Sequence, residues 1–129
     1  MPANLDHMIL MVNDQEKSVA FYTRILGFVH ERERGRFSVV RLTPDFVLQL
    51  APWGTKGGEH LAFAMSRGEF EDVFARVRDA GLEYGDSFDA VGNMRGPGEA
   101  EGAKGPTRSV YFFDPSRHLI EIMYYAQGR

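Results

Sequence analysis

The sequence of 129 residues contains no cysteine. This absence excludes disulfide bonds, thiolate catalysis and zinc sites with sulfur ligands. Any metal ion must therefore be bound by histidine, aspartate, glutamate or similar ligands. The sequence also lacks a signal peptide and any apolar run near the roughly 18 residues that span a membrane. We therefore expect a cytoplasmic protein without a membrane partner.

An excess of basic residues is absent as well. Lysine and arginine number 15 against 18 acidic residues, which gives a formal net charge of −3. Such a chain has no basic footprint for nucleic acid or for anionic membrane surfaces. With 43% hydrophobic residues and the length of one typical domain, residues 1–129 are expected to form a single globular domain around one core.

What the sequence does contain is a pair of strands with an acid in its apolar part. The stretch 109–125 is rich in Val, Tyr, Phe and Ile and has a turn signal at 114–116, which predicts two strands joined by a tight turn. Glu121 interrupts the second apolar run and shares a strand face with Leu119 and Met123. A buried carboxylate needs a cation, a metal ion or a structural partner. The alternative is an edge-strand glutamate that faces water.

The first half of the chain predicts a βαβββ unit. Residues 5–12 form an apolar, strand-like run, and Asn13 with Glu16 forms a helix-capping signature. The helix is expected to stop at Gly27. Three strand-like stretches follow, at 28–34, 37–42 and 46–50, separated by turn residues.

The same pattern begins again at Glu59. A strand-like run is followed by a second capping signature, Ser66 with Glu69, and by a helical stripe of Phe and Val that ends at Gly81. A shift of 53 residues superimposes the first strand and the capping signature of one half on those of the other. A shift of 71 residues takes residues 38–39 to 109–110. We interpret the chain as a duplicated module, 1–53 and 59–129, within one domain.

Two stretches interrupt this pattern. Residues 52–58 predict a short flexible connection between the modules. Residues 91–108 contain five glycines and two prolines, which predicts a long loop without regular structure. Such a loop is either a lid at the mouth of a cavity or a mobile excursion without a role.

The duplication places four polar residues at equivalent positions in apolar strands. They are His7 and His60 on the first strand of each module and, with one inserted residue in the turn, Gln49 and Glu121 on the last. Modules related by a pseudo-twofold axis would direct all four side chains toward a common cavity. Two imidazoles and one carboxylate form the ligand set that binds Fe(II) and leaves positions open, and the same set suits Zn, Mn or Ni.

The other two histidines, His30 and His118, have no counterpart in the repeat and are expected at the surface or rim.

Four stretches of the sequence resemble the vicinal oxygen chelate superfamily, which includes glyoxalase I, extradiol dioxygenases, and fosfomycin- and bleomycin-resistance proteins. They are LDHMILMVND, KSVAFYTRILGF, GEHLAFAM and GAKGPTRSVYFFDPSRHLIEI, and the resemblance covers essentially the whole chain. It implies an α+β fold in which two βαβββ modules with mixed sheets form an open cup around a divalent metal ion. It also implies His7, His60 and Glu121 as ligands, a small-molecule substrate and a homodimer.

The resemblance also narrows the reaction. Glyoxalase I has a glutamate ligand where this chain has Gln49, and three ligands are more similar to extradiol dioxygenases or fosfomycin-type transferases. Tyr111 lies ten residues before Glu121, as an active-site tyrosine does in extradiol enzymes. The leading hypothesis is thus Fe(II)-dependent ring cleavage of a catechol-type substrate with Tyr111 as a catalytic residue. The alternatives are glyoxalase- or fosfomycin-type isomerase or transferase chemistry, and a non-enzymatic protein that binds a small molecule or drug.

The remaining predicted site residues are contacts to the substrate. They are Gln49 at the base of the cup and three basic residues of the glycine-rich stretch that can meet an anion, Arg95, Lys104 and Arg108.

Overall fold

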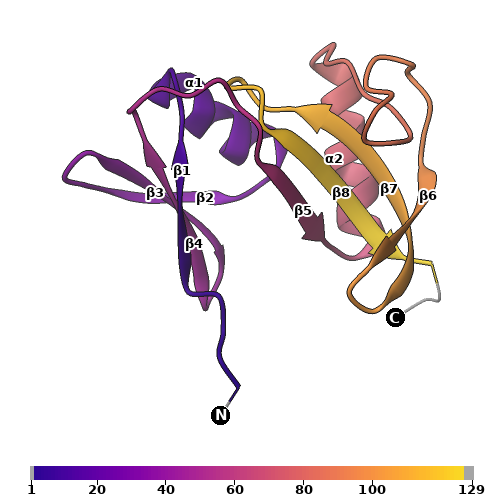
Figure 1. The fold of residues 1–129 in the computed structure, drawn as a ribbon, viewed down its shortest axis with the longest axis horizontal. Coiled ribbons are helices and arrows are strands. Elements are labelled where there is room, and N and C mark those ends of the chain that lie inside the picture. Colours follow the sequence, from indigo (N-terminus) through magenta and orange to yellow (C-terminus); the bar gives the residue numbers. More distant parts are fainter. Residues whose placement is uncertain (1, 127–129) are drawn as a thin grey trace. The chain divides into compact units, whose positions relative to one another are not determined.

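The computed structural model describes residues 2–126, which form two compact units that divide between Gly57 and Gly58. Each unit combines a four-stranded mixed sheet with a helix (Figure 1). This confirms the predicted α+β class. Within residues 2–126 no helix is both long and apolar enough to span a membrane.

The first unit is the predicted βαβββ module. Its sheet has the order β1-β4-β3-β2, in which β1 and β4 are parallel and the other pairs antiparallel. The elements in chain order are β1 (His7–Met11), α1 (Gln15–Ala20), a π-helical turn η1 (Phe21–Ile25), β2 (Val29–Arg34), β3 (Phe37–Thr43) and β4 (Phe46–Ala51).

The start of α1 differs from the prediction by one residue. Asp14, not Asn13, is the N-cap: its backbone is extended and its side chain accepts a hydrogen bond from the Lys17 amide. The Asn13 side chain instead accepts a hydrogen bond from the Thr55 amide, at 2.8 Å. Both residues are good caps, so neighbouring contacts decide which of them begins the helix. Gly27 follows the helical segment with a positive φ of 83°, as predicted for its stop.

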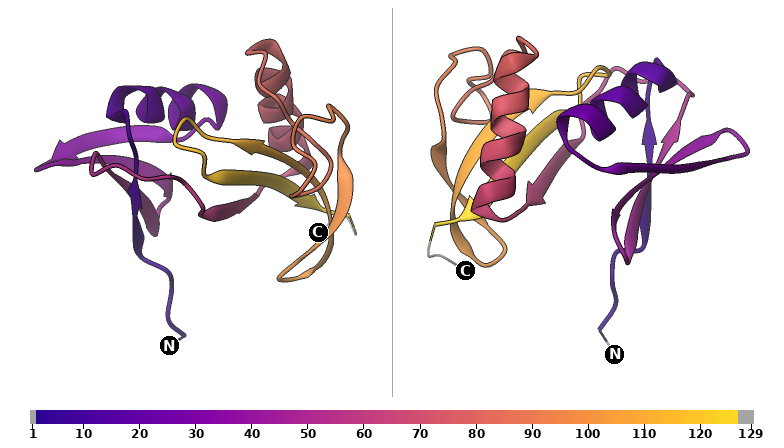
Figure 2. Two further views of the ribbon diagram at one scale, coloured as in Figure 1. Left: turned by 45° about the horizontal axis from the view of Figure 1, so that its top comes forward. Right: turned by 180° about the vertical axis from the view of Figure 1, so that it is seen from behind.

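The second unit repeats the same order of elements. Its sheet has the order β5-β8-β7-β6, again with a parallel first pair, β5 with β8. The elements are β5 (His60–Ala64), α2 (Arg67–Asp79), β6 (Gly98–Gly102), β7 (Gly105–Phe113) and β8 (Leu119–Tyr125). Helix α2 packs along one face of this sheet against β8 (Figure 2).

Helix α2 begins and ends as predicted. The Ser66 side chain accepts a hydrogen bond from the Glu69 amide, and Gly81 follows the helix with a φ of 73°. The predicted apolar stripe is buried; its members are Phe70, Val73, Phe74 and Val77.

The prediction of a long irregular loop at 91–108 is wrong in its second half. Residues Gly98–Gly102 form strand β6, which pairs with the first part of β7 as a hairpin. The glycines of β6 serve close packing. A Cβ atom on Gly98 would lie 2.2 Å from the Asp86 carbonyl oxygen, and one on Gly102 would lie 2.7 Å from the Tyr125 hydroxyl. A glycine-rich stretch can therefore be a strand where other chain segments approach it closely.

Strand pairing confirms that the predicted polar residues occupy equivalent positions in the sheets of the two units. In the first unit His7 pairs with Val47 and Ile9 with Gln49. In the second, His60 pairs with Leu119 and Ala62 with Glu121. Gln49 and Glu121 are thus both opposite the residue two places after the histidine. The relation of the two modules by a pseudo-twofold axis, and the cup between them, remain predictions.

Each sheet has one face covered by its helix and a second face that we call the helix-free face. The covered faces hold the cores; their fully buried members include Leu48 and Leu50 in the first unit and Ile120 and Ile122 in the second. Since side chains alternate along a strand, the register places His7 and Gln49 on the helix-free face of the first unit. It places Glu121 and its cross-strand partner Tyr111 on the helix-free face of the second.

Gly85 extends the second sheet beside Tyr111. Its amide donates to the Tyr111 carbonyl at 2.9 Å, and the Tyr111 amide donates back at 3.0 Å. A Cβ atom on Gly85 would lie 2.1 Å from the carbonyl oxygen of Ala90. Backbone, not a flexible side chain, occupies that space.

Gly85→Ala is therefore expected to lower the free energy of unfolding by about 1–3 kcal/mol, the range of an overpacked site. The measurement is chemical denaturation monitored by circular dichroism. Gly68→Ala is the matched control, because no atom lies within 4 Å of the added methyl group on helix α2. The control should be neutral or more stable by up to about 1 kcal/mol. Equal stabilities of Gly85→Ala and the wild type would contradict the packing described for Gly85.

Candidate active site

The buried acid predicted at position 121 has a histidine partner. Strand β8 lies between β5 and β7, so Glu121 is not on an edge strand, and its residue is 6% exposed. The His60 Nε2 atom lies 3.1 Å from Glu121 Oε1, and about half of the imidazole is accessible to solvent. The alternative of a glutamate facing water is therefore wrong, and the carboxylate is paired as its burial requires.

Tyr111 completes a cluster with this pair. It lies directly opposite Glu121 on β7 and is 6% exposed, and its ring centroid lies 6.2 Å from that of His60. Burial raises the pKa of Tyr111 to about 12, with further contributions from the charge of Glu121 and a hydrogen bond with its carboxylate. A smaller opposing contribution comes from a hydrogen bond with Ser109. The phenol is thus protonated at neutral pH and is a hydrogen-bond donor.

His7 and Gln49 lie together in the first unit. The His7 Nδ1 atom is 2.9 Å from Asp6 Oδ2, and half of its side chain is exposed. The contact with Asp6 is made by Nδ1 and does not involve the other ring nitrogen, Nε2. Sequence reasoning missed Asp6, although an acid adjacent to a candidate ligand is a signal for such an orienting contact. Gln49 is half-buried on the same face.

The structure thus brings together His60, Glu121 and Tyr111 in one unit, and His7 and Gln49 in the other. Among residues 2–126 it contains no group of three or more histidine, aspartate and glutamate side chains arranged to hold a metal ion. Among these residues, the His60–Glu121 pair therefore has no third histidine, aspartate or glutamate arranged with it to hold a metal ion.

The three predicted basic contacts occupy different environments. Arg95 is exposed in the segment before β6, and Lys104 is exposed in the turn between β6 and β7. Arg108 pairs with Tyr124, so it lies on the sheet face opposite that of Glu121. Its guanidinium donates to the Pro97 carbonyl at 3.1 Å and lies 3.5 Å from the Glu99 carboxylate. This placement argues against a contact between Arg108 and a substrate held at Glu121.

The prediction for His118 is wrong. It was expected at the surface or rim, yet it is 1% exposed, and its Nδ1 atom accepts a hydrogen bond from the Glu59 amide at 3.3 Å. Its own amide donates to Asp114 Oδ1 at 2.9 Å. His118 therefore connects the β7–β8 turn with Glu59, the residue that directly precedes β5.

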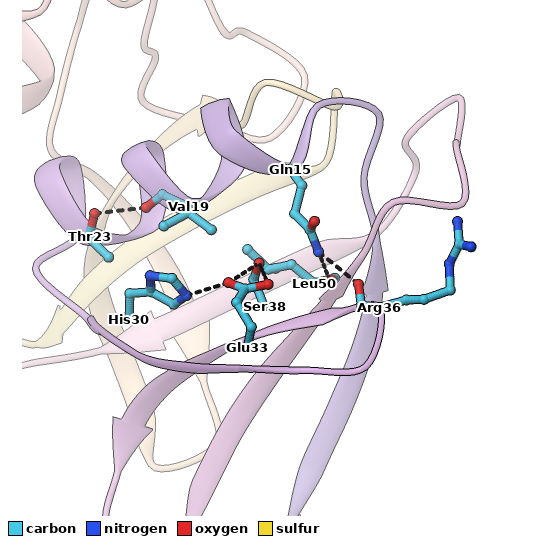
Figure 3. Close-up of polar contacts among 8 residues, drawn as sticks. All are labelled: Gln15, Val19, Thr23, His30, Glu33, Arg36, Ser38 and Leu50. Carbon is cyan, nitrogen blue, oxygen red and sulfur yellow. Dashed lines mark hydrogen bonds and ion pairs between the residues drawn. The ribbon is translucent and has the colours of Figure 1, made fainter.

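His30 lies at the surface, as predicted, but on the helix-covered face. It pairs with Val40, and its Nε2 atom lies 2.6 Å from Glu33 Oε2, which also accepts from Ser38 (Figure 3). These side chains line a cavity of about 370 Å³ beside Gln15 of helix α1. His30 and His7 therefore lie on opposite faces of the same sheet.

Comparisons with known proteins agree with this fold. The model of the Glyoxalase/Bleomycin resistance protein/Dioxygenase superfamily matches residues 4–122. Glutathione transferase FosA of Serratia marcescens is 30% identical over 129 residues, which cover 95% of this chain and 81% of that protein. Virulence protein STM3117 of Salmonella typhimurium is 28% identical over 94% of this chain and 83% of that protein.

A solved structure of similar length extends the comparison. Oxidase ChaP-H1 superimposes with a TM-score of 0.80 at 28% identity, covering 99% of this chain and 100% of that one. Together with the repeated module and its matched strand registers, these similarities confirm the resemblance to the vicinal oxygen chelate proteins. The chain belongs to the Glyoxalase/Bleomycin resistance protein/Dioxygenase superfamily.

Proposed function

We propose that this protein is a metal-dependent enzyme in which His7, His60 and Glu121 bind a divalent ion and Tyr111 assists the reaction. The observation that carries the proposal is the contact of the buried Glu121 carboxylate with the His60 imidazole beside the Tyr111 phenol. A structural ion pair alone would not require the same two positions to recur in the other unit as His7 and Gln49.

The donor set fits a divalent metal ion. Two ligand atoms that are each about 2.0–2.2 Å from one ion lie about 3 Å apart when neighbouring, and His60 Nε2 and Glu121 Oε1 are separated by 3.1 Å. His7 would be the third ligand through Nε2, with Asp6 orienting its ring through Nδ1. Two imidazoles and a carboxylate favour Fe(II), and they also suit Zn, Mn or Ni. When bound, such an ion acts as a Lewis acid on substrate oxygens or as an oxygen-activating centre.

The reaction that we propose is oxidative cleavage of a catechol-type ring. Tyr111 donates a hydrogen bond to a substrate oxygen on which negative charge develops, because a phenol is protonated at neutral pH and acts as a hydrogen-bond donor. Gln49 is a neutral amide at the position equivalent to Glu121, and it would orient the substrate without binding the ion. The oxidase with full-length similarity supports this class of chemistry.

A second candidate is the transfer of a thiol such as glutathione to a small substrate. It is favoured by the 30% identity with a glutathione transferase. It needs the same three ligands, but no oxygen is consumed.

The deciding experiment is metal analysis of anaerobically purified protein, followed by assays of oxygen uptake with catechol and of glutathione consumption with fosfomycin. Near-stoichiometric iron with catechol-dependent oxygen uptake is the expected result. Bound metal with glutathione consumption and without oxygen uptake would replace ring cleavage by the transferase. Absence of bound metal, also after incubation with Fe(II), Mn(II) and Zn(II), would leave a small-molecule binding protein and contradict the metal-dependent proposal.

A further inference from the structure

The helix-free face of the first unit contains a cavity of about 470 Å³. Its lining combines two aromatic rings, two guanidinium groups and one amide, from Arg34, Gly35, Arg36, Phe37, Gln49 and Trp53. Except for Gln49, sequence reasoning had given none of these residues a role. The signal that was present is the run Arg-Gly-Arg-Phe in a turn between two strands.

The fold places these residues through one tight turn and one strand end. Arg34 and Phe37 are cross-strand partners at the β2–β3 turn, where Gly35 has a φ of +58°. Phe37 is two residues before Val39, which pairs with Gln49, so all these side chains project from one face. Trp53 follows β4 in a turn in which its amide donates to the Ala51 carbonyl at 2.8 Å.

The turn is held in place from the other side of the sheet. The Gln15 side-chain amide donates to the carbonyl oxygens of Arg36 and Leu50, both at 2.9 Å (Figure 3). The Arg36 side chain points away from these contacts (Figure 3). Helix α1 therefore fixes the backbone of the turn to β4, while the guanidinium remains accessible. A binding surface held in this way loses little conformational entropy when a ligand binds.

The aromatic part of the cavity is the pair Phe37 and Trp53. Their ring centroids are 5.6 Å apart with an interplanar angle of 58°, and 52% of Trp53 is exposed. An exposed indole next to a half-buried phenyl ring offers an apolar surface made of two mutually tilted rings. Such a surface favours a planar, aromatic ligand, which can stack or pack edge to face.

The charged part consists of Arg34 and Arg36. Both side chains are exposed, and within residues 2–126 neither has an acidic partner. Arg41 of the same sheet differs, because it forms two hydrogen bonds with the Glu31 carboxylate, both at 3.0 Å. Two uncompensated guanidinium groups beside aromatic rings match an anion, and arginine binds carboxylates through two parallel hydrogen bonds.

We propose that this cavity binds a planar aromatic carboxylate, with its ring against Phe37 and Trp53 and its carboxylate on Arg34 and Arg36. The inference rests on the proposed function in one respect: because His7 and Gln49 lie on the same sheet face, it identifies the substrate as an acidic aromatic compound. The Gln49 amide, which lines the cavity, contributes a hydrogen bond to a ring substituent.

The test uses Trp53 as a direct reporter, since it is the one tryptophan of the chain. Tryptophan fluorescence is titrated with benzoate in the presence of a chelator, and with two matched probes, benzyl alcohol and cyclohexanecarboxylate. Benzyl alcohol has the ring without the charge, and cyclohexanecarboxylate has the charge without an aromatic ring. Benzoate is expected to cause saturable quenching with an affinity about tenfold or more above either probe, because only benzoate satisfies both parts of the cavity.

Three arginine-to-glutamine variants test the charged part of the cavity. Arg34→Gln and Arg36→Gln should each weaken benzoate binding by about tenfold, the loss of one charge-assisted contact. Arg24→Gln removes the same charge from the helical segment of this unit, away from the cavity, and should leave benzoate affinity unchanged. Similar affinities for benzoate and benzyl alcohol, or an equal loss in Arg24→Gln, would overturn the proposal.

The chelator separates this test from that of the proposed function. Benzoate binding without metal supports the proposal that the cavity binds an aromatic carboxylate. If metal analysis then shows no bound ion, only the assignment of the cavity as the substrate site is lost. If metal is bound but benzoate does not bind selectively, the proposed ligand of the cavity is wrong and the proposal of a metal-dependent enzyme is unaffected.

Discussion

Replacing Glu121 with alanine is expected to abolish the stabilisation of the protein by divalent metal ions. An ion that binds the folded chain stabilises it by about 2.7 kcal/mol at a concentration one hundred times its dissociation constant. The wild type should therefore show a rise in melting temperature with added Fe(II), Mn(II) or Zn(II). The alanine variant loses the one carboxylate of the proposed donor set, whose contact with His60 is 3.1 Å. Its melting temperature should not respond to metal.

Two further variants test whether metal binding depends on the charge of Glu121 and not on its volume. Glu121 is buried, so alanine also leaves space and removes a hydrogen bond to Tyr111. Glu121→Gln keeps the volume and removes only the charge, and it should lower metal affinity by at least about a hundredfold, more than the loss of an orienting contact. Gln49→Ala alters the equivalent position of the other unit and should cost far less. An equal metal response in Glu121→Gln and the wild type would remove Glu121 from the metal site.

The duplicated module was predictable because it recurs at every level of the chain. Two capping signatures, two helical stripes and two sets of strands follow the same order, and the strand registers of the two sheets are the same relative to His7 and His60. A repeat also constrains positions that composition obscures. The offset of 71 residues moves β2, Val29–Arg34, onto residues 100–105, which overlap the strand β6 that glycine content concealed.

The errors share a physical cause, which is contact with segments distant in the sequence. The β6 glycines pack against Asp86 and Tyr125, and the buried His118 accepts a hydrogen bond from Glu59. Neither contact leaves a local pattern. The cap at Asp14 instead of Asn13 depends in the same way on Thr55, 42 residues away. Local propensity identified the elements other than β6, and tertiary contacts decided β6 and the details of the others.

The candidate site was predictable in part for similar reasons. Glu121 stood out because a carboxylate in an apolar strand must be compensated, and its partner His60 was one of the two histidines repeated in the sequence. Tyr111 was placed by resemblance, and the register then put it directly opposite Glu121. The cavity at Phe37 and Trp53 had a weaker signal, the run Arg-Gly-Arg-Phe in a turn, because exposed side chains beside a turn are ordinary until a structure shows what surrounds them.

Tyr111→Phe is expected to lower turnover of an established substrate by about a hundred- to a thousandfold, the effect of one lost transition-state hydrogen-bond donor. The phenyl ring keeps the packing against His60 and only the hydrogen bond with Glu121 is lost, so the variant should still fold and retain its metal content. Steady-state oxygen uptake measures the loss, which should lie in kcat, because the hydrogen bond strengthens only as charge develops on the substrate oxygen.

A pH titration of the metal-free protein tests the same residue independently of any substrate. Tyrosine ionises near pH 10.0 when unperturbed, whereas the pKa of folded Tyr111 is raised to about 12. The folded state therefore retains the proton when the unfolded chain has lost it, and the free energy of unfolding should fall as the pH rises from about 10 to about 12. Tyr111→Phe should lose this component of the pH dependence. If turnover is unchanged in the variant while this component disappears, the tyrosine is a buried neighbour of Glu121 without a catalytic role, and the proposed chemistry depends on the three proposed metal ligands alone.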